Sequence, residues 1–362
     1  MTLIKVKSRG TDNVSGRKNL IINGAMNIAQ RGTEVTGLSS SNTYQTVDRM
    51  FIRNSGAGTF TNRQSTDNPG YGFRRSIEFD CTSADSLSAA DFAYMGYKFE
   101  GFDAVLTKKG MTGAGDVTLS FWVKSSETGT AVVGINDSDN ALLQNRQYTI
   151  NAANTWEHKT ITISFIDGTN TFNYDNAQSM MLFWWIASGT DRTSGSLQTS
   201  WSSTVTANEA AGQTVNVMRT TDSYIRFTGI QLEVGSSASD FEHRSFAEEL
   251  SLCQRYYAST YGYGVTTRTF DQSYNGMVYF IGTGNYGMAP LNAVFPVEMR
   301  ATPTVTTYGN GGTASRITYW NGSEETHGTI NRNTRQVTGA SKNAGTQTED
   351  YYSCGMIWDA EL

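Results

Sequence analysis

Apolar and polar residues alternate with a period of two over many short stretches of the chain, which is the pattern of a strand with one buried face. The stretch at residues 117–123 is the clearest case, because Val117, Leu119, Phe121 and Val123 fall on one face. Turn-forming Gly, Asn and Asp residues separate such stretches. Further strands are predicted at residues 76–79, 131–135, 158–165, 180–186, 214–217, 224–230, 277–281, 304–308 and 336–338.

Strands at this spacing, with almost no helical pattern between them, predict an all-β protein of antiparallel sheets stacked as a sandwich or jelly roll. Asn321-Gly322 follows the apolar stretch at residues 317–320 and is typical of a tight hairpin turn. No repeat of roughly 20 to 50 residues is present, which argues against a propeller, a solenoid or a β-helix. No stretch approaches the roughly 20 apolar residues that span a bilayer, so no membrane insertion is expected.

One segment, residues 245–257, has helical spacing instead. Ser245 and Glu248 have the spacing of a capping box at its start. A helix this short is marginal alone, so its apolar stripe must pack on something. Two partners remain open: its own sandwich, or the same helix of two symmetry mates in a homotrimer. The trimer alternative assigns the contact to Phe246, Leu250, Cys253 and Tyr257.

The helix divides the chain, which predicts a multidomain layout. Residues 1–19 form an N-terminal arm and residues 20–244 form a jelly-roll domain. Residues 245–260 contain the connecting helix, and residues 261–362 form a second, smaller domain that resembles a β-sandwich.

The chain carries 28 Lys and Arg against 33 Asp and Glu, for a net charge of −5. An acidic body argues against nucleic-acid binding, which needs a contiguous basic face. The arm is the exception, with five basic residues and one acidic one. A basic arm on an acidic body predicts a tether to an acidic surface, and a solvated tail is the alternative. The basic residues of the arm are Lys5, Lys7, Arg9, Arg17 and Lys18.

Sequence signatures of common catalytic sites are missing. The three histidines have no metal-ligand spacing, and there is no HExxH motif, nucleophile elbow or phosphate-binding loop. The three cysteines are too few and too scattered for a disulfide framework. A pair of carboxylates for glycoside hydrolysis leaves no sequence signature, so that chemistry stays open.

The stretch at residues 137–140 reads Asp-Ser-Asp-Asn and resembles a small loop of oxygen ligands. Asp137 and Asp139 are therefore candidate ligands of a structural calcium ion, and an Asx-rich turn is the alternative. No other cofactor is expected.

The aromatic residues are the best candidates for binding, with 18 Tyr, 17 Phe and 7 Trp in the chain. Trp184 and Trp185 must point to opposite faces of an extended strand, so one belongs to the core. The other can offer a flat apolar face to a sugar ring, and a place in the core or at a subunit interface is the alternative. The candidate glycan-binding residues are Trp122, Tyr174, Trp184, Trp185, Tyr319 and Trp320.

Several stretches resemble bacteriophage tail-fibre and receptor-binding proteins. Residues 19–32 read NLIINGAMNIAQRG, and residues 228–257 read TGIQLEVGSSASDFEHRSFAEELSLCQRYY. Shorter similarities are VDRM at residues 47–50, where Met50 stands in place of the usual Trp, and LSFWVKS at residues 119–125. Residues 295–305 and the final DAEL also recur in such proteins.

The resemblance implies a jelly roll similar to carbohydrate-binding modules, a distal β domain, a homotrimer and attachment to host surface polysaccharide without catalysis. It also implies that the arm attaches to other virion proteins, of the tail or the head. The expected location is the virion, as a tail fibre, after synthesis in the host cytoplasm. Two alternatives remain: a structural decoration or adaptor protein of the virion, and a tail fibre that cleaves glycans.

Overall fold

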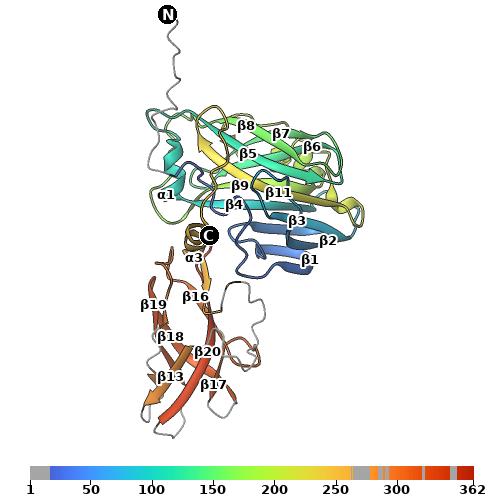
Figure 1. The fold of residues 1–362 in the computed structure, drawn as a ribbon. Coiled ribbons are helices and arrows are strands. Elements are labelled where there is room, and N and C mark those ends of the chain that lie inside the picture. Colours follow the sequence, from blue (N-terminus) through green and yellow to red (C-terminus); the bar gives the residue numbers. More distant parts are fainter. Residues whose placement is uncertain are drawn as a thin grey trace, which may run out of the picture.

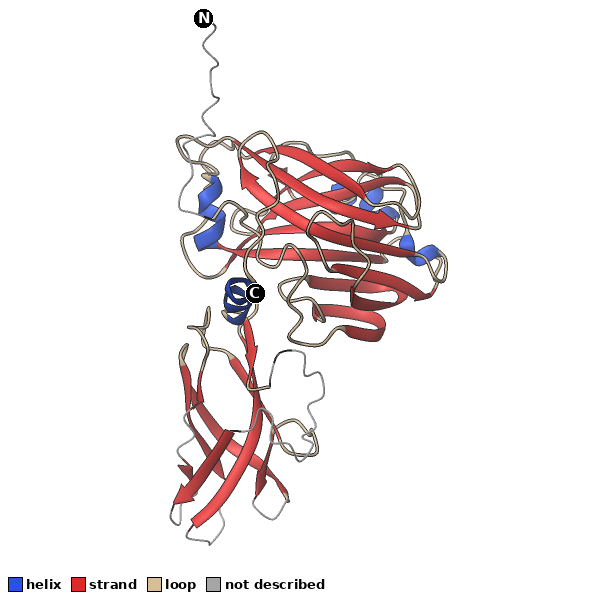
Figure 2. Ribbon diagram, viewed as in Figure 1, coloured by secondary structure: helices blue, strands red, loops and turns tan. Residues whose placement is uncertain are grey.

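The computed structural model describes residues 17–261, 263, 278–283, 288–289, 293–319, 323–342 and 349–362. Two antiparallel β-sheets lie on either side of one helix, with the larger sheet above and the smaller one below in the views of Figures 1 and 2. The prediction of an all-β fold is therefore confirmed. Among the described residues, no helix is long and apolar enough to cross a membrane.

The larger sheet contains eleven strands, all paired antiparallel in the order β10-β7-β6-β9-β4-β2-β3-β11-β5-β8, with β1 on β2. Its strands are β1 (Glu34–Tyr44), β2 (Phe51–Ser65), β3 (Ser76–Ser83), β4 (Phe92–Glu100), β5 (Asp116–Ser125), β6 (Gly129–Asp137), β7 (Leu142–Ile150), β8 (Glu157–Ser164), β9 (Gln178–Ser188), β10 (Ser202–Ser203) and β11 (Tyr224–Val234).

Strand β2 folds this sheet into a two-layered sandwich. Its first half pairs with β4 and its second half pairs with β3. The change falls at Gly56 and Gly58, whose positive φ angles of 75° and 72° suit glycine. The first layer therefore contains β10, β7, β6, β9, β4 and the start of β2. The second layer contains the end of β2 with β3, β11, β5 and β8.

The core lies between the two layers. The ring of Trp184 in β9 lies 5.9 Å from Phe121 in β5 and 6.2 Å from Phe227 in β11, so residues of opposite layers meet. All four apolar residues predicted for one face of β5 are fully buried. The period-two pattern therefore identified this part of the core correctly.

One predicted strand, residues 214–217, is wrong. The chain there is irregular and continues into a 3₁₀ turn, η3 (Val217–Arg219). The backbone N–H groups of Thr214 and Val215 both donate to the carbonyl oxygen of Thr130, at 2.9 and 3.0 Å, instead of forming a ladder. The other short helical segments are α1 (Gly101–Ala104), α2 (Thr190–Thr193), η1 (Val105–Thr107) and η2 (Thr206–Asn208).

The connecting helix α3 (Phe246–Gln254) begins where the capping box predicts, because the N–H of Glu248 donates to Ser245 Oγ at 3.3 Å. It ends sooner than predicted, and Tyr257 lies in a strand. Its buried side chains are Glu249 and Cys253, while Phe246 is 50% exposed. The predicted apolar stripe is therefore wrong at both ends, because Phe246 is exposed and Tyr257 is not helical. Within this chain, the helix packs against its own sandwich.

In the described part of the chain, the smaller sheet contains nine strands in the order β12-β20-β17-β18-β19-β14, with β13 and β16 on β20 and β15 on β19. Residues 318 and 324 face each other across the β17–β18 pair, while the predicted Asn321-Gly322 turn lies outside the described residues. The strands are β12 (Tyr257–Ser259), β13 (Val278–Thr283), β14 (Met288–Ala289), β15 (Ala293–Val294), β16 (Thr304–Tyr308), β17 (Arg316–Tyr319), β18 (Glu324–Arg332), β19 (Gln336–Lys342) and β20 (Glu349–Asp359).

Candidate functional site

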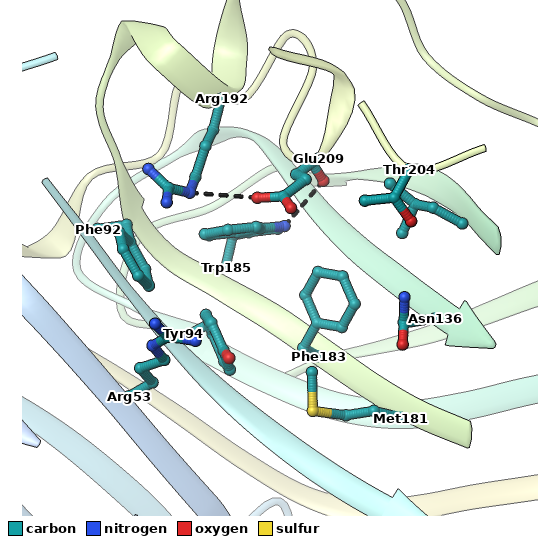
Figure 3. Close-up of a pocket in the computed structure, with 11 residues that line it drawn as sticks. Arg53, Phe92, Tyr94, Asn136, Met181, Phe183, Trp185, Arg192, Thr204 and Glu209 are labelled. Atoms are coloured by element: carbon teal, nitrogen blue, oxygen red, sulfur yellow. Dashed lines mark hydrogen bonds and ion pairs between the residues drawn. The ribbon is translucent and has the colours of Figure 1, made fainter. Parts of the chain in front are cut away.

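A pocket of about 240 Å³ opens on the outer face of the first layer, away from the sandwich core (Figure 3). Strands β2, β4, β6, β7 and β9 supply its floor, and the segment from α2 to η2 supplies one wall. The lining residues are Arg53, Phe92, Tyr94, Asn136, Leu143, Met181, Phe183, Trp185, Arg192, Thr204 and Glu209.

Strand alternation places an aromatic row on this outer face. In β9, Trp184 points into the core while Phe183 and Trp185 point outward with Tyr94 of β4. The Tyr94 ring centroid lies 5.6 Å from that of Phe183, 5.3 Å from that of Trp185 and 5.9 Å from that of Phe92. Neighbouring rings at these separations support one another, so the floor of the pocket is held rigidly.

Gly134 of β6 makes room for the ring of Phe183, its direct neighbour across the β6–β9 pair. A Cβ atom at this glycine would lie 2.2 Å from Cζ of Phe183. The ring therefore lies across the backbone of β6, and Figure 3 shows it between Trp185 and Asn136. A glycine at this position is required by the close approach of the ring.

Charged groups form the rim above this floor. Arg192 Nε lies 3.2 Å from a carboxylate oxygen of Glu209, and the Arg192 guanidinium lies 3.9 Å from the centroid of the Phe92 ring. Trp185 Nε1 donates to the backbone carbonyl of Glu209 at 2.9 Å, which ties the wall to the floor. Arg53 is exposed and lies 5.2 Å from the centroid of the same Phe92 ring.

Burial sets the ionisation of the groups in the pocket. It raises the pKa of the Glu209 carboxyl above its usual range, and the neighbouring Arg192 offsets this only in part. Burial also raises the pKa of the Tyr94 hydroxyl, against the opposing effect of Arg53. The pocket therefore combines flat apolar rings with charged, amide and hydroxyl groups, which is the composition of a site for a small polar ligand.

The structure places the candidate glycan-binding residues in different parts of the molecule. Trp185 lines the pocket although it is only 1% exposed, whereas Trp184 is fully buried in the core between the layers, which conflicts with its prediction as a ligand contact. Trp122 lies on the other layer, where its ring stacks with Tyr71 at 5.0 Å. Tyr174 is 76% exposed and lies away from the pocket. The Tyr319 side chain and Trp320 lie outside the described residues.

Most of the pocket was missed by sequence reasoning. Phe92 and Tyr94 belong to a strand that is apolar on both faces, so its alternation is hidden. Arg192 and Glu209 come from irregular segments that no pattern marks. The sequence feature that could have indicated this part of the pocket is the FxY spacing at residues 92–94, which places two rings on one face of a strand.

The structure gives the predicted calcium ligands Asp137 and Asp139 partners within the protein. The Nζ of Lys109 lies 2.7 Å from Asp137 Oδ2, and both side chains are fully buried. Asp139 instead accepts hydrogen bonds from the N–H and Nδ2 of Asn173, at 2.9 and 3.0 Å. An ammonium group thus takes the position of a cation beside Asp137. In the described part of the chain, no group of three or more His, Cys, Asp or Glu side chains is placed to hold a metal ion.

Two basic residues of the arm contact the sandwich itself. Arg17 Nη1 lies 3.7 Å from a carboxylate oxygen of Asp103, and Lys18 donates to the carbonyl oxygen of Asp240 at 2.5 Å. These two side chains therefore anchor the arm to the jelly roll. The remaining basic residues of the arm, Lys5, Lys7 and Arg9, lie outside the described residues.

No protein-family model and no curated protein matches this chain. The enzymatically active domain of tailspike protein 4 of bacteriophage CBA120 is similar at 12% identity and a TM-score of 0.34, over 60% of this chain and 21% of that one. A family 61 carbohydrate-binding module in complex with β-1,4-galactotriose is similar at 8% identity and a TM-score of 0.30, over 60% of this chain and all of the module. A putative sugar-binding protein from Bacteroides thetaiotaomicron has 13% identity and a TM-score of 0.31 over the same shares. These TM-scores are low, so the architecture described above rests on the strand pairing of this chain itself.

Proposed function

We propose that this chain is a non-enzymatic glycan-binding protein of a bacteriophage virion, which attaches to host surface polysaccharide during adsorption. The observation that carries glycan binding is the pocket with an aromatic floor and a polar rim on the first layer. Sugar rings have apolar C–H faces and hydroxyl edges, so they pack against aromatic rings and hydrogen-bond to groups around them.

The size and chemistry of the pocket suit one unit of a polysaccharide. Its volume of about 240 Å³ is below the roughly 300–1,000 Å³ of pockets for drug-sized ligands. Asn136 and Thr204 add an amide and a hydroxyl group to the lining that contains the charged pair of Arg192 and Glu209. A small site of this kind binds weakly, so useful adsorption depends on many copies acting together.

A homotrimer would place three copies of the binding site on one fibre. We infer this state, and the attachment of the arm to other virion proteins, from the resemblance of residues 19–32 and 228–257 to phage tail-fibre proteins. Several linked sites on one fibre raise the effective affinity without any new contact, provided that they reach the same surface.

The pocket has too few carboxylates for the usual mechanism of glycoside hydrolysis, which favours binding over cleavage. Glycoside hydrolases need two carboxyl groups about 5–10 Å apart. Among the described residues that line the pocket, Glu209 alone carries a carboxylate, and it is paired with Arg192. If purified protein releases new reducing ends from host polysaccharide, the glycan-cleaving alternative replaces this proposal.

The direct test compares Phe183→Leu with Tyr174→Leu for binding to immobilised host polysaccharide. Leucine at position 183 keeps the apolar volume but removes the ring, and loss of an aromatic contact costs about 0.5–1.5 kcal/mol beyond its buried area. Up to about tenfold weaker binding per site is therefore expected. The control removes an exposed ring elsewhere and is expected to bind normally. Equal affinities of the two variants would contradict the assignment of the pocket.

Phage particles that carry Phe183→Leu distinguish recognition from a decoration or adaptor role. Recognition predicts particles of normal composition that adsorb poorly. Normal adsorption of such particles would favour the structural alternative.

A further inference from the structure

Three cations lie along the aromatic row. The guanidinium groups of Arg192 and Arg53 lie 3.9 and 5.2 Å from the Phe92 ring centroid, and Nζ of Lys98 lies 4.0 Å from that of Phe51. This concentration of positive charge is unexpected in a chain whose net charge is −5. Its place beside the pocket suggests a role in the choice of ligand.

Two of these cations already have partners. Arg192 is paired with Glu209 and also donates to the carbonyl oxygen of Ala90 at 3.0 Å. Lys98 donates to the carbonyl oxygen of Leu362 at 2.7 Å. Both groups are therefore occupied within the protein.

Arg53 differs from both. It is exposed, its side chain shares a hydrogen bond with Tyr94 rather than with a carboxylate, and no carboxylate of the described residues forms an ion pair with it. The flat face of Phe92 supports its guanidinium beside the opening of the pocket. An arginine held in this way presents a planar set of donors, which matches the two oxygens of a carboxylate.

We propose that the pocket selects an acidic sugar, in which the ring lies against Phe183 and Tyr94 and the carboxylate binds the guanidinium of Arg53. This inference rests on the proposed function and narrows it to polysaccharides that contain uronic acids. The acidic body repels such polymers at long range, so a local cation at the site is what makes their binding favourable. Glu209 keeps Arg192 in place, which leaves Arg53 as the rim cation that can take a carboxylate from the ligand.

The test uses a panel of capsular polysaccharides that contain uronic acids, each beside the same polymer after chemical reduction of its carboxyl groups. Dissociation constants are measured for the unaltered protein, Arg53→Gln and Arg74→Gln. Arg74 is an exposed arginine outside the pocket, so its variant is a control with the same change of charge. An exposed side chain is not needed for folding, and Arg53→Lys tests charge without the planar group.

The unaltered protein and Arg74→Gln are expected to bind the acidic polymers at least tenfold more tightly than the reduced ones. Arg53→Gln is expected to bind both forms equally, and Arg53→Lys to recover part of the difference. Equal binding of acidic and reduced polymers by the unaltered protein would overturn this inference and leave glycan binding intact. Binding to neither form would overturn the proposed function as well.

Discussion

Asn19 shows what the residues behind the tail-fibre resemblance do. Its Oδ1 accepts hydrogen bonds from the N–H groups of Ile21 and Leu232 at 3.0 and 3.1 Å, and its Nδ2 donates to the carbonyl oxygen of Ile230 at 3.1 Å. The buried side chain thus satisfies backbone groups where the first described segment meets β11. The resemblance in this segment therefore reflects folding rather than a binding site.

Gly24, in the same segment, is a position where we expect an added side chain to destabilise the protein. A Cβ atom there would lie 2.1 Å from the carbonyl oxygen of Ile230, whose N–H donates to the carbonyl of Gly24 at 2.9 Å. Gly24→Ala is expected to lower the free energy of unfolding by about 1–3 kcal/mol, as other overpacked sites do. Urea unfolding measures this. Gly115→Ala is the control, since nothing lies within 4 Å of its added Cβ atom and no loss of stability is expected.

The raised pKa of Glu209 predicts that the free energy of unfolding depends on pH. Burial raises the pKa of this carboxyl in the folded protein, so the folded state binds its proton more tightly than the unfolded state does. The stability that this group contributes is present below its unfolded pKa and is lost as the pH rises through its folded pKa. The free energy of unfolding of the unaltered protein, relative to Glu209→Gln, is therefore expected to fall as the pH rises above about 4.3, the ordinary pKa of a Glu side chain.

Urea unfolding of the two proteins across that range measures the difference. If the unaltered protein instead gains stability over Glu209→Gln as the pH rises, the ion pair with Arg192 outweighs burial and the expected sign is wrong.

Helix α3 shows how far periodicity predicts an element. The capping box located its start, but the buried face contains Glu249, which a sequence pattern assigns to the surface. The Glu249 carboxylate accepts a hydrogen bond from the N–H of Asn23 at 2.5 Å and lies 3.3 Å from Arg244. Asn23 lies more than 200 residues away in the chain, so no local pattern contains the contact that makes this burial favourable.

Ser245→Ala tests the start of this helix. The variant leaves the N–H of Glu248 without its acceptor, so the free energy of unfolding is expected to fall by about 0.5–2 kcal/mol. Ser251→Ala removes an exposed hydroxyl from the same helix and is expected to change stability little. Thermal unfolding of both variants checks this. Equal melting temperatures would show that the cap contributes nothing.

The missed strands have a common physical cause. Strand β4 is buried on both faces, so its residues form an apolar run without alternation. Strand β2 contains two glycines at its bend, which interrupt the pattern of a single strand. Strands with one solvent-facing side, such as β8, were predicted because water and core impose the alternation. Arg53, Phe92 and Tyr94 of the pocket lie on β2 and β4, which explains why this side of its floor was not predicted.

At the scale of the whole molecule, several of the stretches that resemble tail-fibre proteins contribute contacts at the junction of the two sheets, where Figure 1 places the C-terminus beside α3. Arg31 and Arg49 of the larger unit both pair with the Glu361 carboxylate. The Arg49 guanidinium also lies 3.5 Å from the centroid of the Tyr256 ring. The sequence does not predict this cluster, because Arg49 and Glu361 lie 312 residues apart.

A second set of contacts reinforces the junction. Arg300 donates to the carbonyl oxygens of Ala360 and Glu361 at 2.7 and 3.2 Å. Its own carbonyl accepts from Asn176 of the jelly roll at 2.7 Å. The last residues of the chain thus contact both units, and we expect the orientation of the smaller sheet to depend on the charged cluster around Glu361.

Glu361→Ala tests this dependence. The variant leaves the buried guanidinium groups of Arg31 and Arg49 without their shared carboxylate, and breaking a buried ion pair costs about 3–5 kcal/mol. Because the pair connects the two units, we expect calorimetry to show the smaller sheet unfolding in a separate transition at lower temperature. Glu298→Ala is the matched control, since its pair with Arg335 is half-exposed or more on both sides and little effect on stability is expected. If both variants unfold alike, the charged cluster does not stabilise the junction. In that case apolar contacts hold the smaller sheet in place.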